Sequence, residues 1–371
     1  MAKQRYYRLE KLNDTIPADY HILLGERSNG KSYAVKERAL IRAWNDPEKN
    51  KFMLMRRWGM ELKAAYVEQY FTDAPITAIT GGQCNSVVAN AGKIYLAKYN
   101  EETRKNERVA VVGYYRDLMG EQHFVSQNFN DVDLVIFEEF ISRDYYLPDE
   151  CNKLQNFIST VARRRHIDVY MIGNTISRVC PYFNDWGLVN IPKQKQGTID
   201  TYKVKTDQID EITGEPVIIT ITVEYCENSG NNSKMFFGTK SGMITGGAWQ
   251  VTARPHLQGR LADYTIMHEL IFVCKSFKFR MFFLQPKSGG LPIWYVEPYN
   301  YNIYNDVKFK NKRFVVDKFE SGLQINSDLI TVGFTPFNEQ EKTAFCYFER
   351  MCFSDNLTGA DYDACIKALT K

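Results

Sequence analysis

Residues 21–34, HILLGERSNGKSYA, decide the fold of this chain. Residues 21–24 predict a buried strand, and a helix is expected to begin near Lys31. The loop between them has the form G-x-x-x-x-G-K-S and runs from Gly25 to Ser32. A strand, a loop of this form and a helix in this order are typical of a site that binds the phosphates of a nucleotide. The alternative is a surface turn that contains glycines and a lysine by chance.

Each defined position of this loop has a physical task. The two glycines permit backbone conformations that a Cβ disfavours, so that the N–H groups of the loop turn toward anionic oxygens. The first turn of the helix adds unpaired N–H groups. Lys31 would reach the β- and γ-phosphates, and the Ser32 hydroxyl would complete the ligand shell of a Mg²⁺ ion. The residues predicted to bind the nucleotide are Gly25, Glu26, Arg27, Ser28, Asn29, Gly30, Lys31, Ser32 and Tyr33.

A second decisive stretch is VDLVIFEEF, residues 132–140. Four consecutive apolar residues before two acids predict a central parallel strand whose carboxyl end carries Glu138 and Glu139. In P-loop ATPases this is the Walker B strand, where the first acid serves the Mg²⁺ shell and the second polarises the attacking water. Glu138 is therefore a predicted metal residue together with Ser32, and Glu139 a predicted catalytic residue. The first acid is more usually Asp, and a buried strand followed by a charged loop is the alternative.

Polar residues also end the next two elements. Residues 147–166, LPDECNKLQNFISTVARRRH, predict a helix that ends in Arg163 and Arg165. These arginines could complement the helix dipole, or in a ring ATPase they could stand at the γ-phosphate of a neighbouring subunit. The strand expected at 167–174 ends in Asn174, the sensor position of additional-strand ATPases. We predict catalytic roles for Asn174 and for the two arginines.

The remaining stretches predict further strands. KFMLMRRW (51–58) is a short apolar strand that ends in two arginines, as expected near the ligand crevice of an α/β sheet. Short β-rich runs occupy 76–115, and 184–225 is a β-rich edge with a hairpin at 213–216. Residues 226–250, rich in Gly, Asn, Ser and Thr, indicate a linker subdomain. Beyond residue 257 come aromatic, basic strands and then a helical tail, roughly 338–371.

Composition narrows the class of protein. The chain has 371 residues, 44% of them hydrophobic and 25% charged, which indicates a globular protein long enough for two domains. It has no apolar run of membrane-spanning length and no apolar signal region, so we expect an intracellular protein without a membrane partner. Eight scattered cysteines and five scattered histidines form no zinc motif. A net charge of +3 is too small to prove a polyanionic partner.

Several segments together resemble the packaging ATPases of small phi29-type tailed phages. They are GERSNGKSYA, VDLVIFEEFISR, TVARRR, MIGN and CPYFNDWGLVN, and the similarity covers roughly residues 15–225. The resemblance implies an α/β P-loop ATPase domain of the additional-strand class, with a parallel sheet core, over residues 1–225. It further implies a small linker subdomain at 226–258. The last part, 259–371, would be an α+β, RNase H-like domain that is a degenerate nuclease.

The resemblance also implies a function. Such ATPases form a homomeric ring, typically a pentamer, on the portal of an empty prohead and drive double-stranded DNA inward with ATP and Mg²⁺. The expected location is the cytoplasm of the infected bacterial host, and the need for a structural RNA stays open. Lys31 and Ser32 would be Walker A residues, and Arg27 the arginine within that loop. Glu138 and Glu139 would be the Walker B acids, and Asn174 would be the sensor. Arg163, ahead of Arg165, would be the trans-acting finger.

Two other functions stay open from the residues alone. An ordinary P-loop NTPase could act as a phosphotransferase or a regulatory switch, with no ring and no DNA. A third class is a terminase with an active nuclease. The acids of the C-terminal part do not support it, because they are scattered and form no tight cluster. They include Asp263, Glu269, Asp306 and Asp317. DNA-stimulated ATP hydrolysis separates the first two classes.

Overall fold

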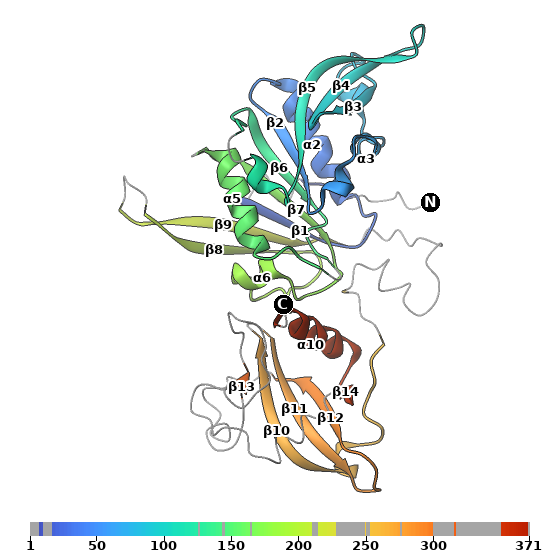
Figure 1. The fold of residues 1–371 in the computed structure, drawn as a ribbon, viewed down its shortest axis with the longest axis vertical. Coiled ribbons are helices and arrows are strands. Elements are labelled where there is room, and N and C mark those ends of the chain that lie inside the picture. The colour runs from blue at the N-terminus through green and yellow to red at the C-terminus, as the bar shows by residue number, and fades with distance from the viewer. Residues whose placement is uncertain are drawn as a thin grey trace. The chain divides into compact units, whose positions relative to one another are not determined.

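The computed structural model divides the chain into two compact units (Figure 1). Unit 1 contains residues 1–176 and 185–249, and unit 2 contains residues 177–184 and 250–371. The short segment 177–184 therefore belongs with the C-terminal part of the chain. The linker expected at 226–258 lies mostly outside the described residues, so the three-part division stays a prediction. The structure describes residues 7–9, 17–124, 127–142, 145–163, 165–209, 214–227, 249, 253–274, 277–299, 315–316 and 350–369.

Unit 1 is built on a nine-stranded sheet with the order β3-β4-β5-β2-β6-β7-β1-β9-β8. The strands from β5 to β9 in this order are parallel to their neighbours. β7 lies between β1 and β6, so an additional strand separates the P-loop strand from the Walker B strand, as the sequence predicts. These central strands are β5 (Lys105–Asp117), β2 (Lys51–Arg56), β6 (Val132–Glu138), β7 (Asp168–Asn174), β1 (Tyr20–Gly25) and β9 (Pro216–Tyr225).

Antiparallel hairpins form both margins of this sheet. β3 (Ser86–Asn90) and β4 (Lys93–Asn100) extend it beyond β5. β8 (Thr198–Ile209) pairs with β9 at the other margin, where Gly214 occupies a left-handed conformation in the connecting turn. The predictions of extra strands before residue 115 and of a hairpin near 213–216 are confirmed.

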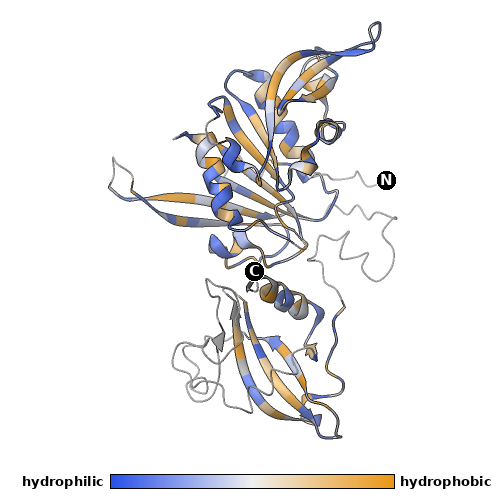
Figure 2. Cartoon of the chain, in the orientation of Figure 1, coloured by the Kyte–Doolittle hydropathy of each residue, from blue (hydrophilic) through white to orange (hydrophobic). Residues whose placement is uncertain are grey.

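Helices cover both faces of the sheet. α2 and α5 follow β1 and β6, and Figure 1 shows them on opposite faces, as right-handed crossovers in opposite directions require. Val35 and Leu40 of α2 pack with Leu23, Leu54 and Ile136 of the central strands. The strands β1, β2, β6 and β7 are largely apolar and buried (Figure 2), because both of their faces are covered. The helical segments of unit 1 are α2 (Lys31–Asn45), η1 (Gly59–Leu62), α3 (Ala64–Tyr70), α4 (Ile76–Ile79), η2 (Glu121–Phe124) and α5 (Glu150–Ala162). A further short helix, α6 (Pro181–Asp185), belongs to unit 2 except for its last residue.

Unit 2 is an α+β structure, as predicted. β10 (Tyr264–Cys274), β11 (Phe277–Pro286) and β12 (Ile293–Pro298) form an antiparallel meander after η3 (Leu261–Asp263). β13 (Val315–Val316) runs parallel to β10, β14 (Met351–Phe353) runs parallel to β12, and α10 (Asn356–Leu369) follows. Its core includes Val179 from segment 177–184, together with Phe279, Met281, Trp294, Phe353 and Tyr362.

The predicted helical tail, roughly 338–371, is wrong over residues 351–353. These residues form β14, where Cys352 and Phe353 are buried. The helix begins only at Asn356, because the Asp355 carboxylate accepts a hydrogen bond from the Thr358 backbone N–H (2.8 Å) and caps its first turn. Residues 338–349 of that prediction lie outside the described residues. Within the described residues, no helix is long and apolar enough to cross a membrane.

Candidate nucleotide-binding site

The P-loop connects β1 to α2 as the sequence predicts. A Cβ on Gly25 would lie 3.1 Å from the side-chain amide nitrogen of Asn29 and 3.3 Å from Cys226 Cβ, so a side chain there would require these neighbours to shift by a few tenths of an ångström. Ser28 and Gly30 have left-handed backbones, with φ of 60° and 99°. Gly30 then accepts the first helical hydrogen bond, from the Ala34 N–H (2.9 Å). The chain therefore turns within a few residues and points the start of α2 toward the loop.

Lys31 lies inside the loop and is 4% exposed. Its ammonium group donates to the Glu26 carbonyl (2.6 Å) and to Asn29 Oδ1 (3.1 Å). Burial lowers the pKa of this amine, because the charged form has lost most of its water. A polyphosphate in the loop would supply the negative oxygens that a buried ammonium lacks.

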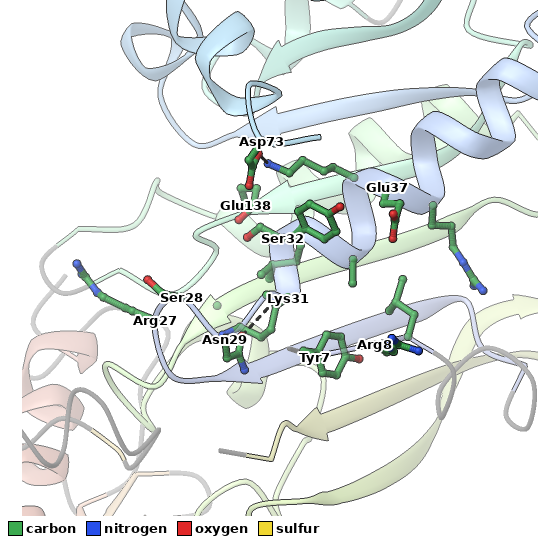
Figure 3. A pocket seen from close by; sticks show the side chains of 18 of the residues that line it. Tyr7, Arg8, Arg27, Ser28, Asn29, Lys31, Ser32, Glu37, Asp73 and Glu138 are labelled. Atoms are coloured by element: carbon green, nitrogen blue, oxygen red, sulfur yellow. Dashed lines mark hydrogen bonds and ion pairs between the residues drawn. The ribbon is translucent and has the colours of Figure 1, made fainter. Parts of the chain in front are cut away.

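Ser32 and Glu138 meet across the start of α2 and the end of β6. The Ser32 hydroxyl favours the charged form of the Glu138 carboxylate, and Figure 3 shows the two side chains facing one another. Glu138 is 5% exposed, and burial raises the pKa of its carboxyl. A hydroxyl and a carboxylate are the hard oxygen donors that Mg²⁺ prefers, so this pair fits a Mg²⁺ ion.

A third oxygen reaches Glu138 from α3. The Tyr70 hydroxyl donates to Glu138 Oε1 at 2.7 Å. Burial and the adjacent carboxylate raise the pKa of Tyr70 well above its ordinary value, so the phenol keeps its proton and remains a donor. No motif marks Tyr70 in the sequence, since 68 residues separate it from Glu138.

Glu139 has a different environment from its neighbour. Its backbone is left-handed, with φ of 55°, and its side chain is 60% exposed. Glu139 Oε2 lies 2.9 Å from the Arg56 guanidinium. Arg57 donates to the carbonyl oxygens of Glu139 (3.3 Å) and Phe140 (2.6 Å) and also holds Glu150. Arg56, the last residue of β2, and Arg57, which follows it, therefore fix the turn that carries the second acid.

Asn174 ends β7 beside Gly25, its register partner in β1. The strand order thus brings Asn174 to the same sheet edge as the P-loop and the two glutamates. Asn174 lines one cavity with a volume of about 1520 Å³. The predicted site residues that also line this cavity are Arg27, Ser28, Asn29, Gly30, Lys31, Ser32, Tyr33, Glu138 and Glu139. Gly25 and Glu26 are not among its lining residues.

Further residues of this cavity have no motif in the sequence. Tyr7 reaches it from the N-terminal part, where its N–H donates to the Asn29 carbonyl (2.8 Å) and its hydroxyl to Glu224 (2.7 Å). Arg8 and Asp73 also line it (Figure 3). Because these side chains come from segments far apart in the chain, only the tertiary structure shows that they line the cavity.

The two candidate finger arginines lie outside this cavity and differ from one another. Arg165 donates to the carbonyl oxygens of Phe129, Val132 and Val161 at 3.0–3.1 Å. Arg163 is exposed, follows the last residue of α5 in a left-handed conformation (φ 42°) and donates to the Gln127 carbonyl (2.9 Å). The helix ends before both arginines. The geometry therefore ties Arg165 to its own chain and leaves Arg163 at the surface.

Comparison with known proteins gives one family and several structures. The family described as podovirus DNA encapsidation protein (Gp16) matches residues 1–210. Over 98% of this chain and 99% of the other, the fold is similar to that in the bacteriophage phi29 viral genome packaging motor assembly, at 18% identity and a TM-score of 0.53. No curated protein sequence matches.

Two further structures give lower TM-scores. The N-terminal domain of the DNA packaging ATPase from bacteriophage phi29 is 24% identical over 62% of this chain and 99% of that one, with a TM-score of 0.45. The Phi-28 gp11 DNA packaging motor is 16% identical over 98% and 99%, with a TM-score of 0.49.

Proposed function

Because the chain belongs to the family of podovirus DNA encapsidation proteins, we propose that it is an ATPase that drives double-stranded DNA into a preformed prohead. The observation that carries this proposal is the cavity at the carboxyl edge of the sheet. It joins the P-loop, two successive glutamates and a polar strand end. These are the parts that hydrolysis of a nucleoside triphosphate needs.

Each side chain has a proposed task. Lys31 binds the β- and γ-phosphates, and the N–H groups around Gly30 bind the remaining phosphate oxygens. Ser32 and Glu138 hold Mg²⁺, which when bound neutralises charge that develops on the phosphates. Glu139 accepts a proton from the attacking water, and Asn174 orients that water against the γ-phosphate. Glu139 suits this task because its side chain is more than half exposed at the cavity wall.

Assembly into a ring extends the proposal. We propose a homomeric ring, a pentamer, docked on the portal of the prohead in the host cytoplasm, with duplex DNA in its lumen and with or without a structural RNA. Arg163 is the proposed trans-acting finger, because it is exposed and lies away from the chain's own cavity. Arg165 is the weaker candidate, since three backbone carbonyls already occupy its guanidinium.

One experiment tests the function as a whole. ATP hydrolysis per subunit is measured against protein concentration, with and without duplex DNA. A ring motor gives a rate per subunit that rises with concentration and rises again with DNA. A phosphotransferase or switch gives a rate that is independent of both. That second result would contradict the proposed motor function but not the proposed nucleotide-binding site.

A further inference from the structure

Glu138 stands where related strands more usually carry Asp, and its longer side chain has a physical consequence. The extra methylene adds a rotatable bond, so the carboxylate samples more positions and loses more entropy when it is held in one. A residue that serves a metal ion needs an orienting partner, because such partners fix the ligand oxygen and tune its affinity. Ser32 supplies one contact to Glu138.

Tyr70 supplies the second contact. Its hydroxyl lies 2.7 Å from Glu138 Oε1 and, as a proton donor to a carboxylate, makes a charge-assisted hydrogen bond. The ring cannot swing away freely, since Phe71 packs edge-on against it with ring centroids 4.9 Å apart. The carboxylate is therefore held between a hydroxyl on the P-loop helix and a phenol on α3.

Lys36 fixes Tyr70 in turn. Lys36 is four residues after Ser32 and is therefore on the same face of α2. Its ammonium group donates to the Tyr70 carbonyl (2.6 Å), lies 4.7 Å from the centre of the Tyr70 ring and pairs with Asp73. Lys36 is 4% exposed, although its partner Asp73 is 64% exposed, so the ammonium group itself is buried beside Tyr70. A continuous series of contacts thus begins and ends on α2. It runs through Ser32, Glu138, Tyr70 and Lys36.

We propose that Tyr70 is a positioning residue that holds the Glu138 carboxylate in the Mg²⁺ shell and so lets a glutamate do the work of an aspartate. This inference rests on the proposed function, because it assumes that Mg²⁺–ATP binds between Ser32 and Glu138. It assigns α3, which lies outside both nucleotide motifs, a role in metal binding.

The test compares Tyr70→Phe with Tyr66→Phe in the full chain. Tyr66 lies one turn earlier in α3 and is 52% exposed, so its phenol serves as the matched control. The Mg²⁺ concentration that half-maximally strengthens binding of a fluorescent ATP analogue is measured. We expect a rise of about tenfold for Tyr70→Phe and no change for Tyr66→Phe, as for the loss of one hydrogen bond to a charged group. Analogue binding in EDTA should stay unchanged.

A double-mutant cycle with Glu138→Asp separates positioning from a general structural effect. The shorter aspartate retracts from the phenol, so Tyr70→Phe should no longer change the Mg²⁺ requirement in that background. The same tenfold shift in both backgrounds would overturn the inference, as would an equal loss of binding in EDTA. If the unsubstituted chain fails to bind Mg²⁺–ATP, the proposed function fails. If it binds and Tyr70→Phe leaves the Mg²⁺ requirement unchanged, only this inference fails.

Discussion

In unit 1 the parallel strands β1, β6 and β7 end at one edge of the sheet, whereas in unit 2 the strands β10, β11 and β12 alternate in direction. The parallel arrangement gathers Glu138 and Asn174 around one cavity beside Gly25, although the three residues lie far apart in the sequence. Charged side chains there face the cavity as well as one another.

Several charged residues of unit 2 are paired with one another instead. Arg280 of β11 contacts Glu269 of the adjacent strand β10, and Arg178 contacts Asp361 of α10. In the part of the chain that the structure describes, no three acidic, histidine or cysteine side chains come close enough to hold a metal ion. The comparison shows that parallel strands bring charged side chains from distant segments to one cavity. The antiparallel strands of unit 2 instead place charges of opposite sign against one another.

The largest expected effect comes from Lys31→Ala in unit 1. Hydrolysis should fall below detection and nucleotide affinity should drop, because the charge that meets the β- and γ-phosphates is lost. The ATPase rate, the affinity for an ATP analogue and the unfolding temperature are measured, with exposed Lys49→Ala as the control. A folded Lys31→Ala protein with full activity would remove the P-loop from the chemistry.

Arg163→Ala should lower hydrolysis about a thousandfold or more if the arginine enters a neighbour's site. Nucleotide binding should persist, and mixing with unsubstituted subunits should suppress activity more than in proportion to the mutant fraction. A strictly linear fall would contradict a trans role.

Arg165→Ala is the matched control two residues away. It leaves the carbonyl groups of Phe129, Val132 and Val161 without their donor, so we expect a loss of stability of about 1–3 kcal/mol. Chemical denaturation measures that loss. If hydrolysis fails in Arg165→Ala and persists in Arg163→Ala, the finger lies at 165.

The two adjacent glutamates should give different phenotypes. Glu139→Gln should bind Mg²⁺–ATP and turn over about a hundredfold to ten-thousandfold more slowly, since the amide cannot take the proton of the attacking water. Glu138→Gln should instead raise the Mg²⁺ concentration needed for hydrolysis. Metal titrations of the ATPase rate check both, and exchanged phenotypes would reverse the order of roles along β6.

A substitution in unit 2 tests whether its charge pairs serve stability and not hydrolysis. Asp361→Asn breaks a buried pair with Arg178 and should cost about 3 kcal/mol of the unfolding free energy, while hydrolysis at low temperature changes less than about twofold. Asp363→Asn, in a half-exposed pair with Arg254, should cost less than about 1 kcal/mol. If Asp361→Asn also lowered the ATPase rate substantially, segment 177–184 would contribute to hydrolysis as well as to stability.

The smallest expected effect is on DNA integrity. The full chain with Mg²⁺ or Mn²⁺ should leave supercoiled plasmid uncut, because a two-metal nuclease needs clustered acids that hold ions about 4 Å apart. Gel analysis of the plasmid measures nicking. Metal-dependent nicks that disappear on Asp263→Asn or Glu269→Gln would place a live nuclease in unit 2.

The sequence alone determined the frame of unit 1. GERSNGKS and VDLVIFEE are short patterns in which a strand, its polar end and the following element are neighbours in the chain, so local propensity suffices to place them. Both strands, the helix that starts at Lys31 and the additional strand ending in Asn174 follow from such patterns. The family resemblance of residues 15–225 is carried by the same stretches.

The tertiary structure decided what lies between those stretches. Tyr70 meets Glu138, and Arg56 meets Glu139, only because α3 and β2 pack beside β6. Arg163 and Arg165 are identical in type, and only the fold distinguishes them, because Arg163 is exposed after α5 whereas Arg165 donates to three backbone carbonyls. Segment 177–184 packs into unit 2, although the chain around it belongs to unit 1. Contacts between residues far apart in the chain depend on the packing of whole elements, and no local pattern contains that information.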